Sequence, residues 1–205
     1  MHRPRACVPM MTLCLLLSAC GGAGGTDAAR AARAPYQAME SCSMTAEVSA
    51  FYGDEVSEFT LRCDYAPEES TVEVLAPETA AGVKAVLSGD GLTLTYEDDC
   101  LPAGPLSGEE LSPASCLPRL MNALRDGWLL EENEEDWGDA PCLRVSLEQT
   151  GTDGSSVDST LWLKKDDHTP ARGEVAVDGK IILQAEFTDF QFGAILDDDS
   201  GAAAG

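Results

Sequence analysis

The sequence predicts a mainly β fold: one large, curved antiparallel sheet of about ten to eleven strands, unclosed like a half-barrel and lidded by one or two helices. Three observations support this prediction. Apolar and polar residues alternate through most of the chain, short turns containing Gly and Asp separate these runs, and one stretch breaks the alternation with helical spacing. Because strands that follow one another tend to pair, we expect a single sheet, and a sheet of that length curls.

The first predicted strands form a hairpin. Residues 44–50 alternate in polarity, Gly53 and Asp54 mark a tight turn, and residues 59–65 form the return strand. Eight further runs have strand character: 71–75, 83–87, 92–96, 128–132, 143–147, 157–164, 173–177 and 180–192.

One amphipathic helix interrupts these strands between Ser112 and Gly127. Ser112 suits the cap, Pro113 suits the first turn, and Gly127 is a plausible stop. The apolar residues at helical spacing are Leu117, Leu120, Met121 and Leu124. The apolar faces of the strands point to a common concave side, over which this helix is the natural lid. Residues 35–41 are a second, shorter helical candidate.

The N-terminus has the pattern of a bacterial export signal. Basic residues precede an apolar run from Ala6 to Leu17, which is too short for an ordinary transmembrane helix. The run ends in Leu-Ser-Ala-Cys at Cys20, which resembles the lipobox of bacterial lipoproteins. That resemblance implies transfer of diacylglycerol to the Cys20 sulfur and cleavage before Cys20, so the mature protein would carry acyl chains such as palmitate.

These features divide the chain into four parts. Residues 1–19 are the predicted signal peptide, 20–34 a flexible Gly/Ala-rich tether that begins with the lipidated Cys20, 35–196 the folded domain, and 197–205 a disordered acidic and alanine-rich tail. The expected location is the outer face of the plasma membrane, or the outer membrane in a cell that has two membranes.

The charge balance excludes several function classes. The chain has 13 Lys and Arg against 36 Asp and Glu, a net charge of −23. Removal of residues 1–19 takes away two arginines and leaves 11 basic residues, so the mature charge is −25. Binding to nucleic acid depends on Lys and Arg and is therefore not expected. Docking on anionic lipid headgroups is also disfavoured, so the acyl chains must hold the protein at the membrane.

We expect no enzyme, no metal site and no cofactor. Asp166, Asp167 and His168 follow Ser155, Ser156 and Ser159 in the sequence, but no Gly-x-Ser-x-Gly elbow accompanies them. The spacing of the cysteines matches no zinc signature. The acidic clusters at 97–99, 131–139 and 197–199 lack the alternating pattern of a calcium loop and are interpreted as solvated charge.

Five cysteines follow Cys20, and Cys42 and Cys63 are a possible disulfide because their faces coincide in the first hairpin. For Cys42 and Cys63 to lie directly opposite each other, the numbers of paired residues in the hairpin must sum to 105. A two-residue turn at Gly53 and Asp54 gives a sum of 107 and a diagonal placement, which is poor disulfide geometry. Both registers stay open at this point. Among Cys100, Cys116 and Cys142 an odd thiol must remain unless pairing is intermolecular, and at least one is expected to be buried and inert.

The order of these parts resembles the LolA/LolB-like lipoprotein-carrier superfamily over residues 35–192. A hairpin is followed by a Pro-containing strand at 72–77, a polar turn into Leu-Thr-Leu-Thr-Tyr, a loop and helix, and strands at 159–163 and 185–190. The element that matches best is Ser88-Gly89-Asp90-Gly91 with Tyr96. The resemblance implies an unclosed β-barrel of about eleven strands with helices over its hollow.

Two hypotheses for function follow. In the first, the concave apolar face binds a hydrophobic ligand, such as the acyl chain of a lipid or a lipoprotein. In the second, the half-barrel is filled, and an edge strand or the acidic face docks another cell-envelope protein. The residues expected to line the hollow are Val48, Phe59, Leu61, Val74, Leu94, Leu120, Leu124, Val145, Leu161, Leu183 and Phe187.

Overall fold

The computed structural model describes residues 26–89, 91–97, 99–105, 111–150 and 156–193. Its helices are α1 (Asp27–Ala38), the short 3-10 helix η1 (Pro113–Ser115) and α2 (Cys116–Asp126). The strands are β1 (Cys42–Tyr52), β2 (Glu55–Tyr65), β3 (Glu69–Ala76), β4 (Lys84–Ser88), β5 (Gly91–Tyr96), β6 (Asp99–Pro105), β7 (Trp128–Trp137), β8 (Ala140–Thr150), β9 (Ser156–Lys164), β10 (Pro170–Val177) and β11 (Lys180–Phe192).

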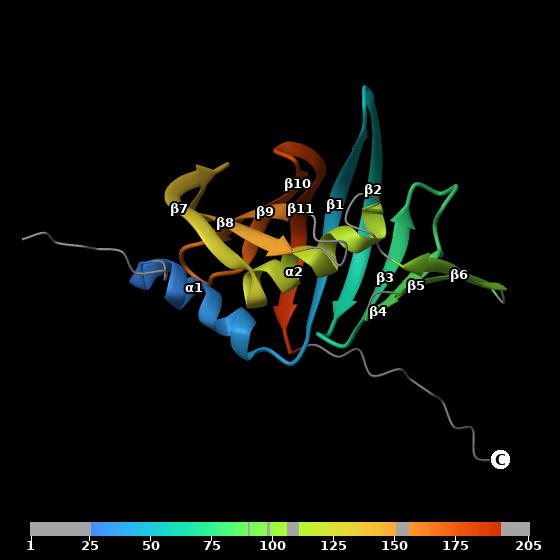
Figure 1. The fold of residues 1–205 in the computed structure, drawn as a ribbon, viewed down its shortest axis with the longest axis horizontal. Coiled ribbons are helices and arrows are strands. Elements are labelled where there is room, and N and C mark those ends of the chain that lie inside the picture. Colours follow the sequence, from blue (N-terminus) through green and yellow to red (C-terminus); the bar gives the residue numbers. More distant parts are fainter. Residues whose placement is uncertain (1–25, 90, 98, 106–110, 151–155, 194–205) are drawn as a thin grey trace, which may run out of the picture.

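All these strands form one antiparallel sheet in the order β6-β5-β4-β3-β2-β1-β11-β10-β9-β8-β7. Strands that follow one another in the chain pair, except β6 and β7, and β1 and β11 join the two halves at the centre. The sheet does not close, because β6 and β7 are its two edges. This confirms the predicted mainly β, unclosed architecture. Figure 1 shows the curvature of the sheet, with α1 and α2 lying on its concave side.

The first hairpin has the register that its two-residue turn predicts. Met44 pairs with Cys63 and Val48 with Phe59, so paired numbers sum to 107. Gly53 adopts a φ of 66°, which the turn requires and which favours glycine. Pairing with β11 ends at Ala50 and pairing of β2 with β3 begins only at Thr60, so the end of the hairpin extends beyond the neighbouring strands.

The predicted lid is η1 followed by α2. Pro113 begins η1, and Gly127 ends α2 by donating its backbone N–H to the carbonyl of Ala123. Seven of the eleven α2 residues are buried, because α2 packs against both the sheet and α1. The prediction of one helix between residues 112 and 127 is confirmed.

The N-terminal region differs from the predicted tether. Residues 27–34 belong to α1, which continues to Ala38, so the short helix predicted at 35–41 is the end of a longer one. The Thr26 hydroxyl caps α1 by accepting a hydrogen bond from the backbone N–H of Ala28. Ala29, Ala32 and Tyr36 form its buried stripe, in which the first two side chains are too small to give a clear apolar signal in the sequence.

Both edge strands also differ from the sequence analysis. β6 lies where no strand was predicted, because Pro102, Gly104 and Pro105 weaken strand propensity. β7 continues to Trp137 through the acidic run that was interpreted only as solvated charge. Charged residues are common on an edge strand because they oppose pairing with other chains.

The predicted signal peptide, Cys20 and the tail at 197–205 lie outside the described residues. Within the described part of the chain, no helix has the length and apolar character needed to cross a membrane.

Candidate functional site

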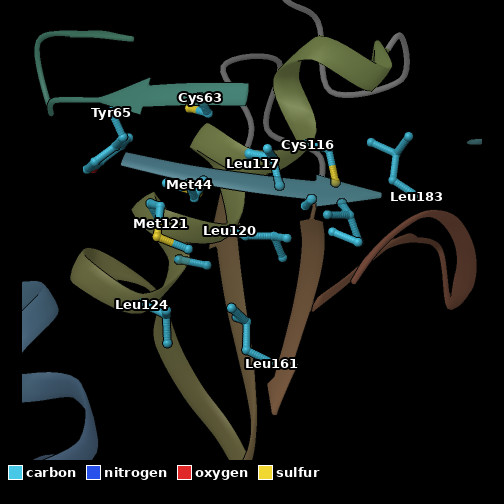
Figure 2. Packing of buried hydrophobic residues seen from close by; sticks show 14 of the residues in the cluster. Met44, Cys63, Tyr65, Cys116, Leu117, Leu120, Met121, Leu124, Leu161 and Leu183 are labelled. Carbon is cyan, nitrogen blue, oxygen red and sulfur yellow. The ribbon is translucent and has the colours of Figure 1, made fainter. Parts of the chain in front are cut away.

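The concave face of the sheet is apolar, and α2 fills its central part. Seven of the predicted lining residues are at most 1% exposed there. They are Val48, Leu61, Leu120, Leu124, Val145, Leu161 and Leu183. Figure 2 shows Leu117, Leu120 and Leu124 of α2 gathered with Met44, Leu161 and Leu183 of the strands. Under α2 the hollow is therefore occupied by the protein's own side chains.

Gly173 on β10 lets α2 approach the sheet closely. A Cβ atom at this position would lie 2.5 Å from Cδ1 of Leu120 and 3.1 Å from its Cδ2. Leu120 is 0% exposed, so the glycine provides the space into which this leucine packs.

Arg33 connects α1 to the end of α2. Its guanidinium donates a 2.9 Å hydrogen bond from Nε to the carbonyl of Leu124 and a 2.8 Å hydrogen bond from Nη2 to the carbonyl of Gly127. The last carbonyls of a helix have no partner within the helix and carry partial negative charge, so a cation stabilises them. Burial lowers the pKa of Arg33 and nearby Asp126 opposes that shift, but the group stays charged at neutral pH.

Two tyrosines hold the helices at other points. The Tyr65 hydroxyl of β2 donates a 2.6 Å hydrogen bond to Oδ1 of Asn122 on α2. The Tyr36 hydroxyl of α1 donates to the backbone carbonyl of His168, and the Tyr36 ring packs against Phe190 and Phe192. Sequence periodicity predicts burial at such positions but identifies none of these partners.

Beyond α2, the same apolar face continues over β3–β6 and becomes progressively more exposed. Val72 pairs with Ala85, Ala85 with Leu94 and Leu94 with Leu101, so this row of side chains lies on one face of four strands. Val72 is 0% exposed, Leu94 is half-buried and Leu101 is 66% exposed.

We call the uncovered part of this face the open apolar patch. It consists of Phe59, Val74, Leu94, Tyr96 and Leu101. The first three were among the predicted lining residues, whereas Tyr96 and Leu101 were not. Leu101 was missed because β6 was not predicted. Phe187 is also only partly buried, and it packs against the core from β11.

A separate hollow opens where β3 separates from β2. It has a volume of about 340 Å³ and lies between the first hairpin and the end of β3. Its lining includes Glu47, Ser49, Glu58 and Thr60, whose side chains lie on the face of β1 and β2 that is opposite to the patch.

The possible disulfide between Cys42 and Cys63 is not formed. Cys42 pairs with Tyr65 and Cys63 with Met44, so the two cysteines are diagonal neighbours, and both are free thiols. A diagonal pair on neighbouring strands is too far apart for a disulfide without a change of register. Cys100, Cys116 and Cys142 are also free, and Cys100 is the exposed one.

The buried thiols are expected to react slowly with alkylating agents. Burial raises the pKa of Cys42 and of Cys116 to about 12, and burial next to Cys42 and Asp64 raises the pKa of Cys63. The thiolate is the reactive form, so Cys100 should be modified first at pH 8. Peptide mapping after timed exposure to iodoacetamide measures this order, and fast labelling of Cys63 in the folded protein would contradict the structure.

The same pKa shifts predict a loss of stability in alkali. Because the folded pKa values of Cys42 and Cys116 lie above the ordinary value of 9.0, their contribution is present below pH 9 and is lost as the pH rises toward 12.

The residues considered for a catalytic triad do not come together. Ser156 donates to Glu148 and Ser159 to Gln149, whereas His168 lies in the turn before β10 with a φ of 60°. Ser155 lies outside the described residues. Within the described ranges, no three His, Cys, Asp or Glu side chains are grouped so that they could hold a metal ion.

The convex face of the sheet carries a small separate cluster that the sequence analysis did not identify. Trp137 and Trp162 pack at a ring distance of 5.8 Å, and the guanidinium of Arg172 lies 4.1 Å from the Trp137 centroid. Cys142 is buried beneath them. This cluster explains why one cysteine is buried on the polar face of its strand.

Comparison with known proteins returns similarity at the level of structure only. No protein-family model matches the chain, and no curated protein matches it. Among solved structures, a LolA superfamily protein from Nitrosomonas europaea is similar at 13% identity with a TM-score of 0.45, covering 83% of this chain and 96% of that one.

Two further structures are similar to the same extent. A putative outer membrane lipoprotein-sorting protein domain from Vibrio parahaemolyticus has 14% identity and a TM-score of 0.45, covering 83% of this chain and 92% of that one. The Mycobacterium tuberculosis lipoprotein LppX has 12% identity and a TM-score of 0.46, covering 82% of this chain and 95% of that one. Likenesses at this level assign no function to this chain.

Proposed function

We propose that this protein is an exported lipoprotein, anchored through acyl chains on Cys20, whose half-barrel binds a hydrophobic ligand such as an acyl chain. The observation that carries the proposal is the continuity of the concave apolar face. Buried side chains under α2 extend without interruption into the open apolar patch over β3–β6. Exposed apolar surface costs free energy in water, so a patch of this kind favours an apolar occupant.

The position of the patch favours a ligand that packs against the exposed end of the hydrophobic core. One end of the row, at Val72, belongs to the core under the helices, and the other end, at Leu101, lies at the edge of the sheet. A chain lying along this row would contact the core at one end and leave its polar end at the edge, near solvent.

Binding of a neutral apolar dye tests the proposal. N-Phenyl-1-naphthylamine should fluoresce on binding, and palmitate esters should displace it. Leu101→Asp should weaken dye binding about tenfold, because it replaces the most exposed apolar contact with a charge. The matched control is Val56→Asp at the end of the first hairpin, where a valine is 54% exposed. Absence of dye binding, or equal loss in both variants, would count against the proposed site.

Anchoring is tested separately by labelling growing cells with a palmitate analogue. Incorporation should require Cys20, so Cys20→Ser should abolish it. Labelling that persists in this variant would place the acyl chains elsewhere.

The filled space under α2 favours a second function, in which the protein docks another cell-envelope protein and carries no ligand. A cross-linked partner that persists when Leu120 or Leu124 is replaced by phenylalanine would support this interaction module. A carrier should instead lose ligand binding under the same change, because both leucines are 0% exposed and any enlargement displaces α2.

A further inference from the structure

We propose that the free edge of β2 at residues 55–59 binds an extended segment of another protein, in which basic and apolar residues alternate. The segment adds to the sheet as a strand in line with β3. This inference gives the docking function described above a site and a partner of stated chemistry. It does not require a ligand on the concave face, so the two proposals can fail separately.

The edge of β2 is unpaired along the outer part of the first hairpin. β2 pairs with β1 from Glu55 to Tyr65, but its pairing with β3 ends where Thr60 meets Ala76. Pro77 follows directly, and the chain turns toward β4. Within the described part of the chain, residues 55–59 therefore have a strand on one side only, over a length of about 17 Å. Figure 1 shows this end of the hairpin projecting beyond its neighbours.

The register of the hairpin determines which backbone groups this edge offers. The two-residue turn closes with Tyr52 opposite Glu55, so alternate residues of β2 from Glu55 onward exchange hydrogen bonds with β1. The N–H and C=O groups of Val56 and Glu58 then face away from β1. An extended peptide beside β2 would satisfy these groups with main-chain hydrogen bonds, which supply much of the affinity in strand addition.

The hollow of about 340 Å³ lies along this edge and favours a basic side chain. Its lining includes Glu58 and Glu47, which are diagonal neighbours on the convex face, and Pro77 at the end of β3. Among the described residues, neither carboxylate forms an ion pair. Side chains of paired strands lie beside one another, so a convex-facing side chain of the added strand would enter the hollow next to Glu58. A lysine or an arginine is complementary to the two carboxylates there.

The concave face of the same edge is apolar. Phe59 follows Glu58 in β2, so its side chain points to the opposite face, where it is half-buried. Alternate side chains of an added strand would point to this face as well, and an apolar residue there would pack against Phe59. The edge therefore fits a segment with basic residues on one face and apolar residues on the other.

A second copy of this chain is a poor occupant of the edge. Glu55 and Glu58 both belong to the unpaired part of β2, so two such edges side by side would bring like charges together. A basic segment would gain from the same carboxylates. The acidic residues thus oppose self-association and select the partner at the same time.

Fluorescence anisotropy with labelled hexapeptides tests the site on the full-length protein in a nonionic detergent. A peptide of alternating lysine and valine should bind, whereas a peptide of alternating glutamate and valine should bind about tenfold more weakly. A lysine-valine peptide with every backbone nitrogen methylated keeps the charge but has no N–H to donate. It should also bind about tenfold more weakly, because strand addition depends on main-chain hydrogen bonds.

Val56→Pro tests the edge from the side of the protein. Proline removes one N–H that faces away from β1 and leaves the charge unchanged, so the lysine-valine peptide should bind about tenfold more weakly. Val56→Ala is the matched control, because it shortens the same side chain and keeps the N–H, and it should bind the peptide as the wild type does. Urea unfolding of both variants checks that the hairpin is intact.

Glu58→Gln tests the charge without a change in the backbone. It should weaken peptide binding about threefold. Glu68→Gln removes the same charge from the turn before β3 and should leave binding unchanged. Equal effects of these two variants, or equal binding of the lysine-valine peptide and its methylated form, would overturn the proposal. Absence of peptide binding would also overturn it, whereas dye binding to the open apolar patch is a separate result.

Discussion

Arg33→Ala is expected to lower the free energy of unfolding by about 2–3 kcal/mol, because it leaves the half-buried carbonyls of Leu124 and Gly127 without their charged donor. The loss should appear first as local opening, since α1 and the end of α2 are held to each other by this side chain. Urea unfolding measures the stability, and hydrogen exchange of the α2 amides measures the opening.

Arg33→Lys separates the effect of the positive charge from the effect of the guanidinium's hydrogen-bond geometry. Arg33→Lys keeps the charge but cannot reach two carbonyls with a planar fork, so it should recover only part of the loss. If Arg33→Ala changes neither unfolding nor exchange, then Arg33 does not hold α1 to α2, contrary to the structure.

Gly173→Val is expected to destabilise the protein by about 1–3 kcal/mol, because its Cβ would lie 2.5 Å from Cδ1 of the wholly buried Leu120. Leu120→Ala alone should cost about 2–5 kcal/mol through the cavity it leaves. In the double variant the new valine methyls can occupy part of that cavity. The double variant should therefore be more stable than the sum of the two single effects predicts.

Gly91→Ala is the matched control, because its Cβ would lie 3.5 Å from the nearest atom, the carbonyl oxygen of Ser88. It should change stability by only a few tenths of a kcal/mol. Additive effects of Gly173→Val and Leu120→Ala would show that the two residues do not share one site, contrary to the structure.

Alternation and turn chemistry predicted most of the sheet because both act locally. The register of the first hairpin followed from the two residues of its turn, Gly53 and Asp54. The helix at Cys116–Asp126 followed from the spacing of four apolar residues. In each case the pattern lies within a few residues of the feature that it determines.

The elements that escaped prediction are those whose stability comes from distant partners. The buried stripe of α1 begins with two alanines, and its strongest contacts are those of Arg33 with α2 and of Tyr36 with His168. β6 has two prolines and is stabilised by pairing with β5. Neither contact has a local signal in the sequence.

In the candidate site, too, local sequence patterns predicted some features, whereas those that depend on distant contacts were missed. Periodicity identified which side chains face the concave side, but it could not say how α2 covers them. The distinction between buried Leu61 and half-buried Phe59 on one strand depends on where the helix ends, and therefore on side-chain packing in three dimensions.

The two free edges of the sheet affect how neighbouring copies of the protein can contact one another. With the proposed anchor on Cys20, copies of this protein would meet at high density in the plane of the membrane, where exposed strand edges template lateral polymers. Here one edge carries Pro102 and Pro105, which have no N–H to donate, and the other carries five carboxylates that repel an identical strand. Neighbouring copies should thus remain separate and diffuse independently, even at high surface density.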